Sequence, residues 1–434
     1  MSDQAHSSGS GTPEKTELTL GFVPLVDAAP LVVAREKGFF AAEGLSVRLA
    51  REASWAALRD RVCSGVFDGG HMLAAIPVAN AFALGGWRVP LVAPMALNLN
   101  GSSVTLSLSL WDEIGAVDAA VRAGDLSVPR ALAQLVRRRR ESGSPPPTFG
   151  VVFPHSIHNY LLRYWLAAGG VDPDRDVRLE VVPPPQMIAY LTAGRIDGYC
   201  VGAPWNELAE VHGVGRIATT GHDVWNNALD KVLGVTAAWA ARRPATLRAL
   251  VRALLRAGEW LDHPANRAEA AYWMARPDVM PVPEAVIERA LRAGGDGTQG
   301  GLIFHRHAAA FPWASRGMWT VSQMRRWGQV GAGARPTTGA AVYDSTIYRL
   351  AAGDLGLPVP AGDTKRDGEH ASPWTAAASD GGAITLGADR FCDGRVFDPE
   401  QFDAYVAGFD IGRPANHKLT DGSANHSTAR EAAS

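Results

Sequence analysis

Stretches with the pattern of β-strands alternate with helix-like stretches through the first half of the chain, and this alternation limits the fold more than any other feature. Alternating apolar and polar residues predict short strands, and apolar residues at helical spacing predict the segments between them. The first series comprises predicted strands 17–23, 45–49, 70–73 and 89–97, with predicted helices 28–40, 54–64 and 76–84. This order favours a parallel, doubly wound sheet, because right-handed crossovers return each strand in the same direction.

A second series of the same kind follows a loop at 141–147 that is rich in Pro and Ser. One helix over 115–142 is predicted to precede that loop. The second series comprises predicted strands 149–153, 177–182 and 198–201, with helices 157–168 and 186–193. Two α/β lobes predict a hinged fold with a cleft, in which ligands bind beyond the carboxyl ends of the strands.

The remainder of the chain sets the predicted domain boundaries. Beyond Lys231 it is mostly helical, with helices predicted at 244–261, 265–274 and 283–293. The predicted first lobe is discontinuous and comprises 17–104 and 231–413, and the second lobe is 105–230. The ends, 1–16 and 414–434, are rich in Ser, Gly, Asn and charge, and this composition predicts disordered tails.

The balance of charge indicates a small ligand rather than a nucleic acid or a membrane. The 434 residues include 42 Lys and Arg and 44 Asp and Glu, for a formal net charge of -2. Binding to a phosphate backbone needs a concentrated cationic face, so we expect no direct nucleic-acid partner. The longest apolar stretch, Ala74 to Leu84, is far shorter than the roughly 20 residues that span a bilayer. We therefore expect no membrane partner.

Cysteine usage and the first residues favour a cytoplasmic location. Cys63, Cys200 and Cys392 are scattered and form no CxxC pair, so neither a disulfide framework nor a cysteine zinc site is indicated. Residues 1–15 contain neither a positive region nor the apolar run of a secretory signal. These features predict a protein that is not exported.

The usual catalytic and cofactor motifs are missing from the sequence. It contains no GxxxxGK[ST], no HExxH, no GxSxG and no cysteine–histidine spacing typical of a metal site. We therefore expect no enzyme activity, no cofactor and no metal. The loops 97–103 and 201–206 are rich in Gly, Asn and Ser and offer backbone N–H groups to an anion, although such loops are more often simple turns.

Six motifs carry a resemblance to a known family over nearly the whole predicted folded part, Leu18 to about Phe409. They are GFVPLVDAAPLVVAREKGFFAAEGL, EASWAALRD, ALNLNG, HNYLLRYWLAAGGVDPDRDV, PPPQMIAYLTAGRIDGYCVGAPWN and DKVLGV. With them the chain resembles the nitrate- and bicarbonate-binding family of ABC-transporter solute receptors, and most closely its cytoplasmic branch of NasS-like nitrate/nitrite sensors. The resemblance implies an α/β, two-lobed fold like that of type II periplasmic binding proteins, with a hinged cleft between the lobes.

The resemblance also implies where the anion binds. In nitrate-binding members the positions that match Trp55, His158, Gly202 and Lys231 hold it between the lobes. Lys231 would supply the single positive charge that matches a monoanion, Trp55 and His158 would donate N–H groups, and Gly202 would admit its backbone amide. Each residue also has a structural alternative: Trp55 as core, His158 as a helix-start residue, and Lys231 as a surface lysine before a strand.

Ser102 is a departure from the family pattern. Relatives often place a glutamine directly after the NG of the asparagine loop, where this chain has a shorter hydroxyl donor. This difference bears on the choice between nitrate and nitrite. The bicarbonate branch is implied to use calcium and to have a carboxylate in place of the lysine, so Lys231 favours the nitrate branch because a fixed cation repels a divalent metal.

The function implied is a cytoplasmic nitrate or nitrite sensor that controls nitrate assimilation. Its partner would be a NasT-like RNA-binding antiterminator with an ANTAR domain, held inactive by the ligand-free sensor and released when the anion binds. A solute receptor of a nitrate ABC importer is the alternative. An enzyme related to thiamine-pyrimidine synthases is disfavoured, because three scattered cysteines do not supply the cysteine-rich iron site of those proteins.

Overall fold

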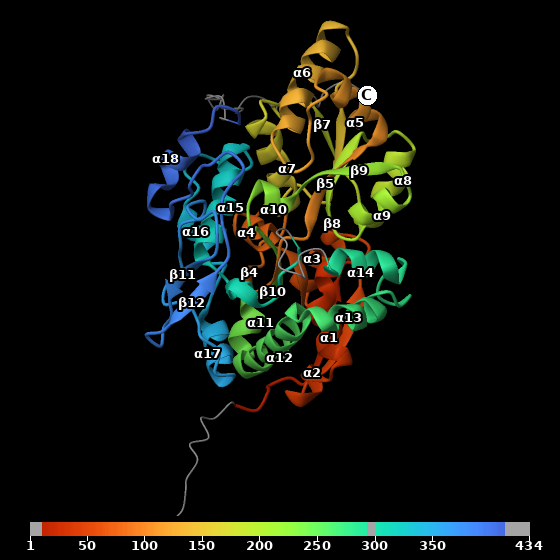
Figure 1. The fold of residues 1–434 in the computed structure, drawn as a ribbon. Helices are drawn as coiled ribbons and strands as arrows, with labels where there is room; N and C mark the ends of the chain where they lie inside the picture. Colours follow the sequence, from red (N-terminus) through yellow and green to blue (C-terminus); the bar gives the residue numbers. More distant parts are fainter. Residues whose placement is uncertain (1–10, 293–300, 413–434) are drawn as a thin grey trace, which may run out of the picture.

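Two five-stranded mixed sheets with helices packed around them make up the two lobes of the protein (Figure 1). The computed structural model describes residues 11–292 and 301–412. The strands of the first sheet lie in the order β2-β1-β3-β10-β4, and those of the second in the order β7-β6-β8-β5-β9. The α/β, two-lobed architecture that the sequence predicts is confirmed.

The first sheet is parallel except for one strand. It consists of β1 (Glu17–Phe22), β2 (Ser46–Arg51), β3 (Gly69–Leu73), β4 (Leu91–Leu99) and β10 (Leu229–Thr236). β1 pairs in parallel with β2 and β3, whereas β10 is antiparallel to both β3 and β4. The prediction of a purely parallel sheet is wrong, because β10 enters from the second lobe and therefore runs in the opposite direction.

The second sheet repeats this arrangement. It consists of β5 (Ser102–Ser107), β6 (Thr148–Val151), β7 (Arg178–Val181), β8 (Gly198–Gly202) and β9 (Gly215–Thr220). β6 is parallel to β7 and β8, and β5 is antiparallel to β8 and β9. In each sheet the antiparallel strand is the one that the chain enters directly after it crosses between the lobes.

The two crossings lie close to the ends of these antiparallel strands. β5 begins at Ser102, so residues 102–104, predicted for the first lobe, belong to the second sheet. β10 begins at Leu229, so Leu229 and Asp230, predicted for the second lobe, belong to the first sheet. The first residues of β5 and of β10 therefore lie where the two lobes meet.

Helices cover both sheets, and a helical return closes the molecule along the first lobe (Figure 1). Those next to the first sheet are α1 (Ala29–Glu36), α2 (Phe39–Ala42), α3 (Trp55–Cys63) and α4 (Ala75–Ala81). Those of the second lobe are α5 (Leu108–Val117), α6 (Ser127–Glu141), α7 (Ile157–Ala168), α8 (Met187–Thr192), α9 (Trp205–Val211) and α10 (Gly221–Val224). The return comprises α11 (Ala237–Arg242), α12 (Pro244–Asp262), α13 (Arg267–Met274), α14 (Glu284–Arg292), α15 (Ala314–Arg326), α16 (Pro336–Ala340), α17 (Thr346–Asp354), the hairpin β11 (Trp374–Ala377) and β12 (Ala383–Leu386), and α18 (Phe402–Ala407).

Two predicted helices are each divided in the structure. The helix expected over 28–40 becomes α1 and α2, because Gly38 has a φ of 72° and turns the chain between them. The helix expected over 115–142 becomes α5 and α6. Asp118 ends α5 in an extended conformation, and residues 119–126 connect the two helices.

The ends of the described chain differ in part from the predicted tails. Residues 11–16 were expected to be disordered, but the carboxylate of Glu14 accepts hydrogen bonds from the backbone N–H groups of Ala245 and Thr246 at the start of α12. Partial burial opposes the ionised form of Glu14, yet these bonds lower its pKa to about 2. The predicted tails 1–10 and 414–434 lie outside the described residues.

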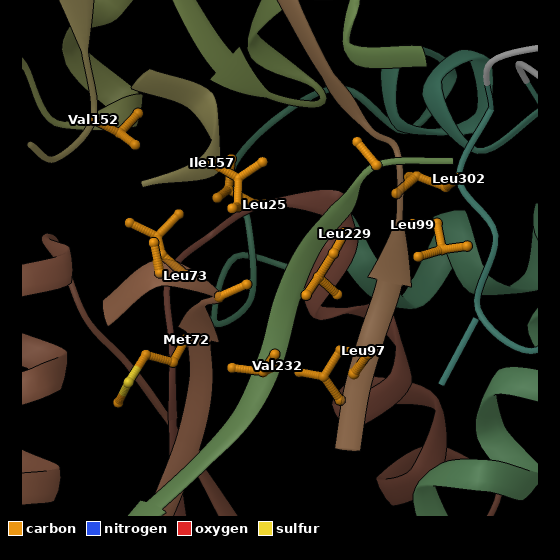
Figure 2. Packing of buried hydrophobic residues seen from close by; sticks show 14 of the residues in the cluster. Leu25, Met72, Leu73, Leu97, Leu99, Val152, Ile157, Leu229, Val232 and Leu302 are labelled. Carbon is orange, nitrogen blue, oxygen red and sulfur yellow. The ribbon is translucent and has the colours of Figure 1, made fainter. Parts of the chain in front are cut away.

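One apolar cluster extends across both sheets and the contact between the lobes. Figure 2 shows part of it, with Val152 and Ile157 from the second lobe and Met72, Leu97 and Val232 from the first sheet. These side chains exclude water from the junction of the lobes, which strengthens electrostatic interactions there. Among the described residues, no helix is both long and apolar enough to cross a bilayer.

Candidate anion-binding site

Four of the sequence-predicted residues meet where the lobes contact each other. Trp55 is the first residue of α3, His158 is in the first turn of α7, Gly202 is the last residue of β8, and Lys231 is in β10. Serine side chains fix both helix starts: Ser54 accepts from Ala57 N at 3.2 Å and Ser156 from Asn159 N at 3.0 Å. These N-caps hold the Trp55 and His158 backbones against β10.

Lys231 lies at the centre of a chain of alternating ionisable groups. Its Nζ donates to Asp27 Oδ2 at 2.6 Å and forms an ion pair with Asp230 Oδ2 at 2.7 Å. The other oxygen of each carboxylate, which does not contact Lys231, contacts an imidazole: Asp27 Oδ1 lies 2.7 Å from His71 Nε2, and Asp230 Oδ1 lies 2.8 Å from His158 Nε2. We call His71, Asp27, Lys231, Asp230 and His158 the ionic chain.

Every member of the ionic chain is buried. Lys231, His71 and His158 are 0% exposed, and Asp27 and Asp230 are 1% and 2% exposed. Burial alone would lower the pKa of Lys231, but Asp230 and Asp27 more than offset it and raise that pKa above its ordinary value. Burial would also raise the pKa of Asp230, but His158 and Lys231 hold it well below its ordinary value. The ammonium and this carboxylate therefore stabilise each other in the charged form.

His71 responds differently to the same surroundings. Burial lowers its pKa below the ordinary value, and the opposing effects of Asp27 do not compensate. With Nε2 bound to the Asp27 carboxylate, the neutral imidazole has an unprotonated Nδ1. Only protonation of His71 would turn Nδ1 into a donor.

Three ring nitrogens around the ionic chain are buried and unpaired within the described part of the molecule: Trp55 Nε1, His71 Nδ1 and His158 Nδ1. The Trp55 ring packs 5.3 Å from that of His71, and Lys231 Nζ lies 5.6 Å from the Trp55 ring centre. A buried polar atom without a partner costs free energy, so such atoms mark a position where a ligand or water binds. The ionic chain therefore has three positions at which a polar ligand or ordered water can bind.

Gly202 lies directly beneath the centre of the ionic chain. A Cβ at this position would be 3.1 Å from Asp27 Oδ2 and 3.6 Å from His158 Cε1. Glycine therefore lets the carboxylate and the imidazole approach the backbone closely. The sequence predicts that an anion lies against the Gly202 backbone. In the structure the carboxylate of Asp27 lies there instead.

Ser102 lies next to this cluster through the backbone. It pairs with Gly202 in the ladder between β5 and β8. Its hydroxyl oxygen would be 2.6 Å from a Cβ at Gly221, so the side chain packs against the start of α10. Ser102 also lines a separate cavity of about 160 Å³, together with Glu207, Thr220 and Arg289. Its predicted role toward the anion stays a prediction.

Sequence reasoning did not identify Asp27, His71 or Asp230. A signal for two of them exists in the sequence, because Asp27 interrupts the apolar run VPLVDAAPLVV and His71 interrupts GGHMLAA. An ionisable residue inside a buried run needs a charged or polar partner. Asp230 precedes Lys231, and adjacent strand residues usually face opposite sides, so its contact with the same ammonium was not expected.

The charges of the ionic chain correct the hypothesis that Lys231 supplies one free positive charge to match a monoanion. Two carboxylates share its ammonium, so this charge is already balanced. One ammonium and two carboxylates sum to a single negative charge when both imidazoles are neutral, to zero when one is protonated, and to a single positive charge when both are. Among residues 11–292 and 301–412, no group of three or more His, Cys, Asp and Glu is arranged to hold a metal ion.

This fold, two mixed α/β sheets joined by two crossings with a polar cluster between them, defines a protein of the two-lobed solute-binding class. The model of the NMT1-like family matches residues 11–275. The chain is 31% identical over 432 residues to the nitrate/nitrite binding protein NrtA of Synechocystis, an alignment that covers 94% of this chain and 89% of the relative. The chain belongs to the NMT1-like family, and within it is similar to the NrtA solute receptors.

A solved structure supports the same assignment. The crystal structure of the periplasmic nitrate-binding protein NrtA from Synechocystis has a TM-score of 0.78 and 28% identity, and covers 92% of this chain and 100% of that one. Higher identity, 38% over 340 residues, is found with the nitrate import ATP-binding protein NrtC of Synechocystis, covering 76% of this chain. The chain spans about half the length of such curated relatives, which include bicarbonate transport ATP-binding proteins CmpC.

Proposed function

We propose that this protein binds nitrate or nitrite at the ionic chain and performs no catalytic step. The observation that carries the proposal is the fully buried ammonium of Lys231, which lies between the lobes with His158 Nε2 at 3.2 Å and with the Gly202 backbone beneath its partner Asp27. Relatives that bear the names of nitrate and nitrite binding proteins support this choice of ligand.

The surroundings favour a small, flat monoanion over a dianion. Sulfate would bring a second charge into a buried cluster that already contains two carboxylates, and burial of an unpaired charge is costly. Trp55 Nε1–H can donate to an oxygen of a planar anion, and the Nδ1 atoms of His71 and His158 can do so only when they carry a proton. The first turn of α7, a helix of 12 residues, adds the favourable end of a helix dipole.

Isothermal titration with nitrate, nitrite, sulfate and bicarbonate tests the ligand. A ceiling of about -1.5 kcal/mol for each of the four heavy atoms of nitrate limits the dissociation constant to about tens of micromolar at the tightest, and we expect the wild type to bind nitrate and nitrite more weakly than this limit. Sulfate should give no heat of binding, and bicarbonate should give none with or without calcium. Calcium-dependent bicarbonate binding in the absence of nitrate binding would contradict the proposal.

The proposed biological role is that of a cytoplasmic sensor which holds a NasT-like antiterminator with an ANTAR domain inactive and releases it when the anion binds. The motif resemblance supports this role, whereas the names of the NrtA relatives support the alternative, a receptor of a nitrate ABC importer. Co-purification with the ANTAR protein separates the two. A complex that forms without nitrate and dissociates with it supports the sensor, and no complex under either condition favours the receptor.

A further inference from the structure

The carboxylate of Asp27 has the same shape and charge as the proposed ligand. It is a flat monoanion with two oxygens, and Oδ2 accepts from Lys231 Nζ at 2.6 Å. The same Oδ2 lies 3.1 Å from the position of a Cβ on Gly202. The third residue of the predicted site, His158, has Nε2 within 3.2 Å of the same ammonium. Asp27 therefore occupies the region that an anion held by Lys231, His158 and Gly202 would need.

The backbone holds Asp27 in this position from both lobes. Asp27 is the middle residue of the short 3₁₀ helix η1 (Val26–Ala28), which follows β1 of the first lobe. The preceding residue, Val26, donates its N–H to the carbonyl of Ala203 at 2.9 Å, and Ala203 directly follows Gly202 in the second lobe. The carboxylate is thus anchored over Gly202 by a hydrogen bond that crosses between the lobes.

A second partner makes release of Oδ2 feasible. The other oxygen of Asp27 lies 2.7 Å from His71 Nε2, and this contact does not involve Lys231. A small rotation of the carboxylate would therefore break the contact of Oδ2 with Lys231 Nζ and preserve the contact of Oδ1 with His71 Nε2. Asp230 is differently placed, because its Oδ1 contacts His158, itself a residue of the predicted anion site.

We propose that Asp27 determines the affinity and selectivity of the site as an internal competitor, whose carboxylate must leave Lys231 before an external anion binds there. This inference rests on the proposed function and adds to it a residue with an opposing role. The exchange replaces one flat monoanion by another at the ammonium. It lowers the apparent affinity by the fraction of molecules in which Asp27 has moved away, and it penalises dianions, which do not match the group displaced.

Titration of nitrate into Asp27→Ala and Asp27→Asn variants tests the competition. We expect both variants to bind nitrate at least tenfold more tightly than the wild type. Asp230→Asn is the matched control for Asp27→Asn, because it neutralises an equally buried carboxylate that pairs with the same ammonium but does not lie against Gly202. A purely electrostatic effect would raise affinity equally in the Asp27 and Asp230 variants, and equal gains would overturn the inference.

Formate provides a second test, because it is the free equivalent of the lost carboxylate. In Asp27→Ala we expect formate to bind and to weaken nitrate binding competitively, whereas in the wild type it should have at least tenfold less effect. No competition in the Ala variant would contradict the inference. Thermal unfolding confirms that each variant is folded, and Asp27→Asn, with nearly the same volume, serves if Asp27→Ala does not fold.

The results separate this inference from the function on which it rests. Nitrate binding by the wild type with no gain in either Asp27 variant removes the internal competitor and leaves the anion site. No binding by the wild type or by any variant removes both. Binding by the Asp27 variants alone supports the competitor and shows that it excludes nitrate from the wild-type site.

Discussion

Replacing Lys231 with Met should abolish nitrate binding and lower the free energy of unfolding by about 3–5 kcal/mol, the usual cost of breaking a buried ion pair. The side chain is 0% exposed, and its loss leaves Asp27 and Asp230 facing each other without the cation between them. Nitrate titration measures the first effect and denaturant unfolding the second. Binding within threefold of the wild type would show that Lys231 is not part of the anion site.

Lys365 offers a matched control for this variant. It is 8% exposed at the side chain and forms ion pairs with two carboxylates, Asp367 and Asp389, in the C-terminal part of the described chain. Lys365→Met should therefore lower stability for the same reason while leaving nitrate affinity unchanged. If both lysine variants lose nitrate binding to the same extent, the loss reflects general destabilisation rather than removal of a ligand contact.

A double variant separates stability from binding within the site itself. Asp230→Asn added to Lys231→Met neutralises one of the two carboxylates that have lost the ammonium and should recover part of the lost stability. It should not recover nitrate binding, since no cation is restored. Recovery of binding in the double variant would mean that charge balance alone, without the ammonium, is enough to hold the anion.

Nitrate affinity should rise as pH falls from neutrality to below about 6.5, by up to about tenfold per unit for each proton taken up with the anion. The ionic chain has a net negative charge when both imidazoles are neutral, and burial lowers the pKa of His71. An anion nearby stabilises protonated His71 and so raises that pKa in the complex. The affinity therefore increases on acidification and levels off below the pKa of free His71.

The groups that face His71 come from three elements, η1, β10 and α3, so the sign of the pH dependence depends on all of them. Asp27 and Asp230 favour its protonation, Lys231 opposes it, and the Trp55 ring packs against it without charge. Nitrate itself keeps its charge through this range, so the protein is the source of any pH dependence. Titration in two buffers with different ionisation enthalpies gives the number of protons taken up. An affinity that is constant or rises with pH would contradict a role for His71.

His71→Gln is the control for the pH dependence. Glutamine can still donate to Asp27 Oδ1, and it does not titrate. In this variant the number of protons taken up with nitrate should fall by up to one, so affinity should change less with pH. Any dependence that remains would belong to other groups of the protein.

Local patterns predicted most of the individual elements, because the information for them lies in neighbouring residues. The helix predicted at 157–168 is α7, and the strand predicted at 198–201 is β8 with one more residue. β5 and β9 were not predicted as strands. The antiparallel direction of β5 and β10 was not predicted either, since it depends on where the chain crosses between the lobes and not on the sequence of either strand. The division at Gly38 follows from one positive φ.

The candidate site was predicted only in part, for a related physical reason. Trp55, His158, Gly202 and Lys231 were found through motifs, and the structure brings them together from both lobes. Their partners come from positions distant in the sequence: Asp27 and Lys231 are 204 residues apart, and Asp27 and His71 are 44 apart. Spacing along the chain contains no direct record of such ion pairs, although a charged residue in an apolar run indicates that one exists.

The ionic chain also bears on how ligand binding would be communicated. It links His71 and Asp27 of the first lobe, through Lys231 and Asp230 of β10, to His158 of the second. An anion that changes the pairing of Lys231 changes a contact between the lobes at the same time. Such a coupling suits either a sensor that releases a partner protein or a receptor that closes around its solute.

A crystal structure of the protein grown with saturating nitrate tests the central claim most directly. We predict nitrate density between the lobes within hydrogen-bonding distance of Lys231 Nζ and the Gly202 backbone, with Asp27 Oδ2 displaced from the ammonium and Oδ1 still beside His71. The result that would contradict this is an intact contact between Lys231 and Asp27, with nitrate bound elsewhere on the molecule.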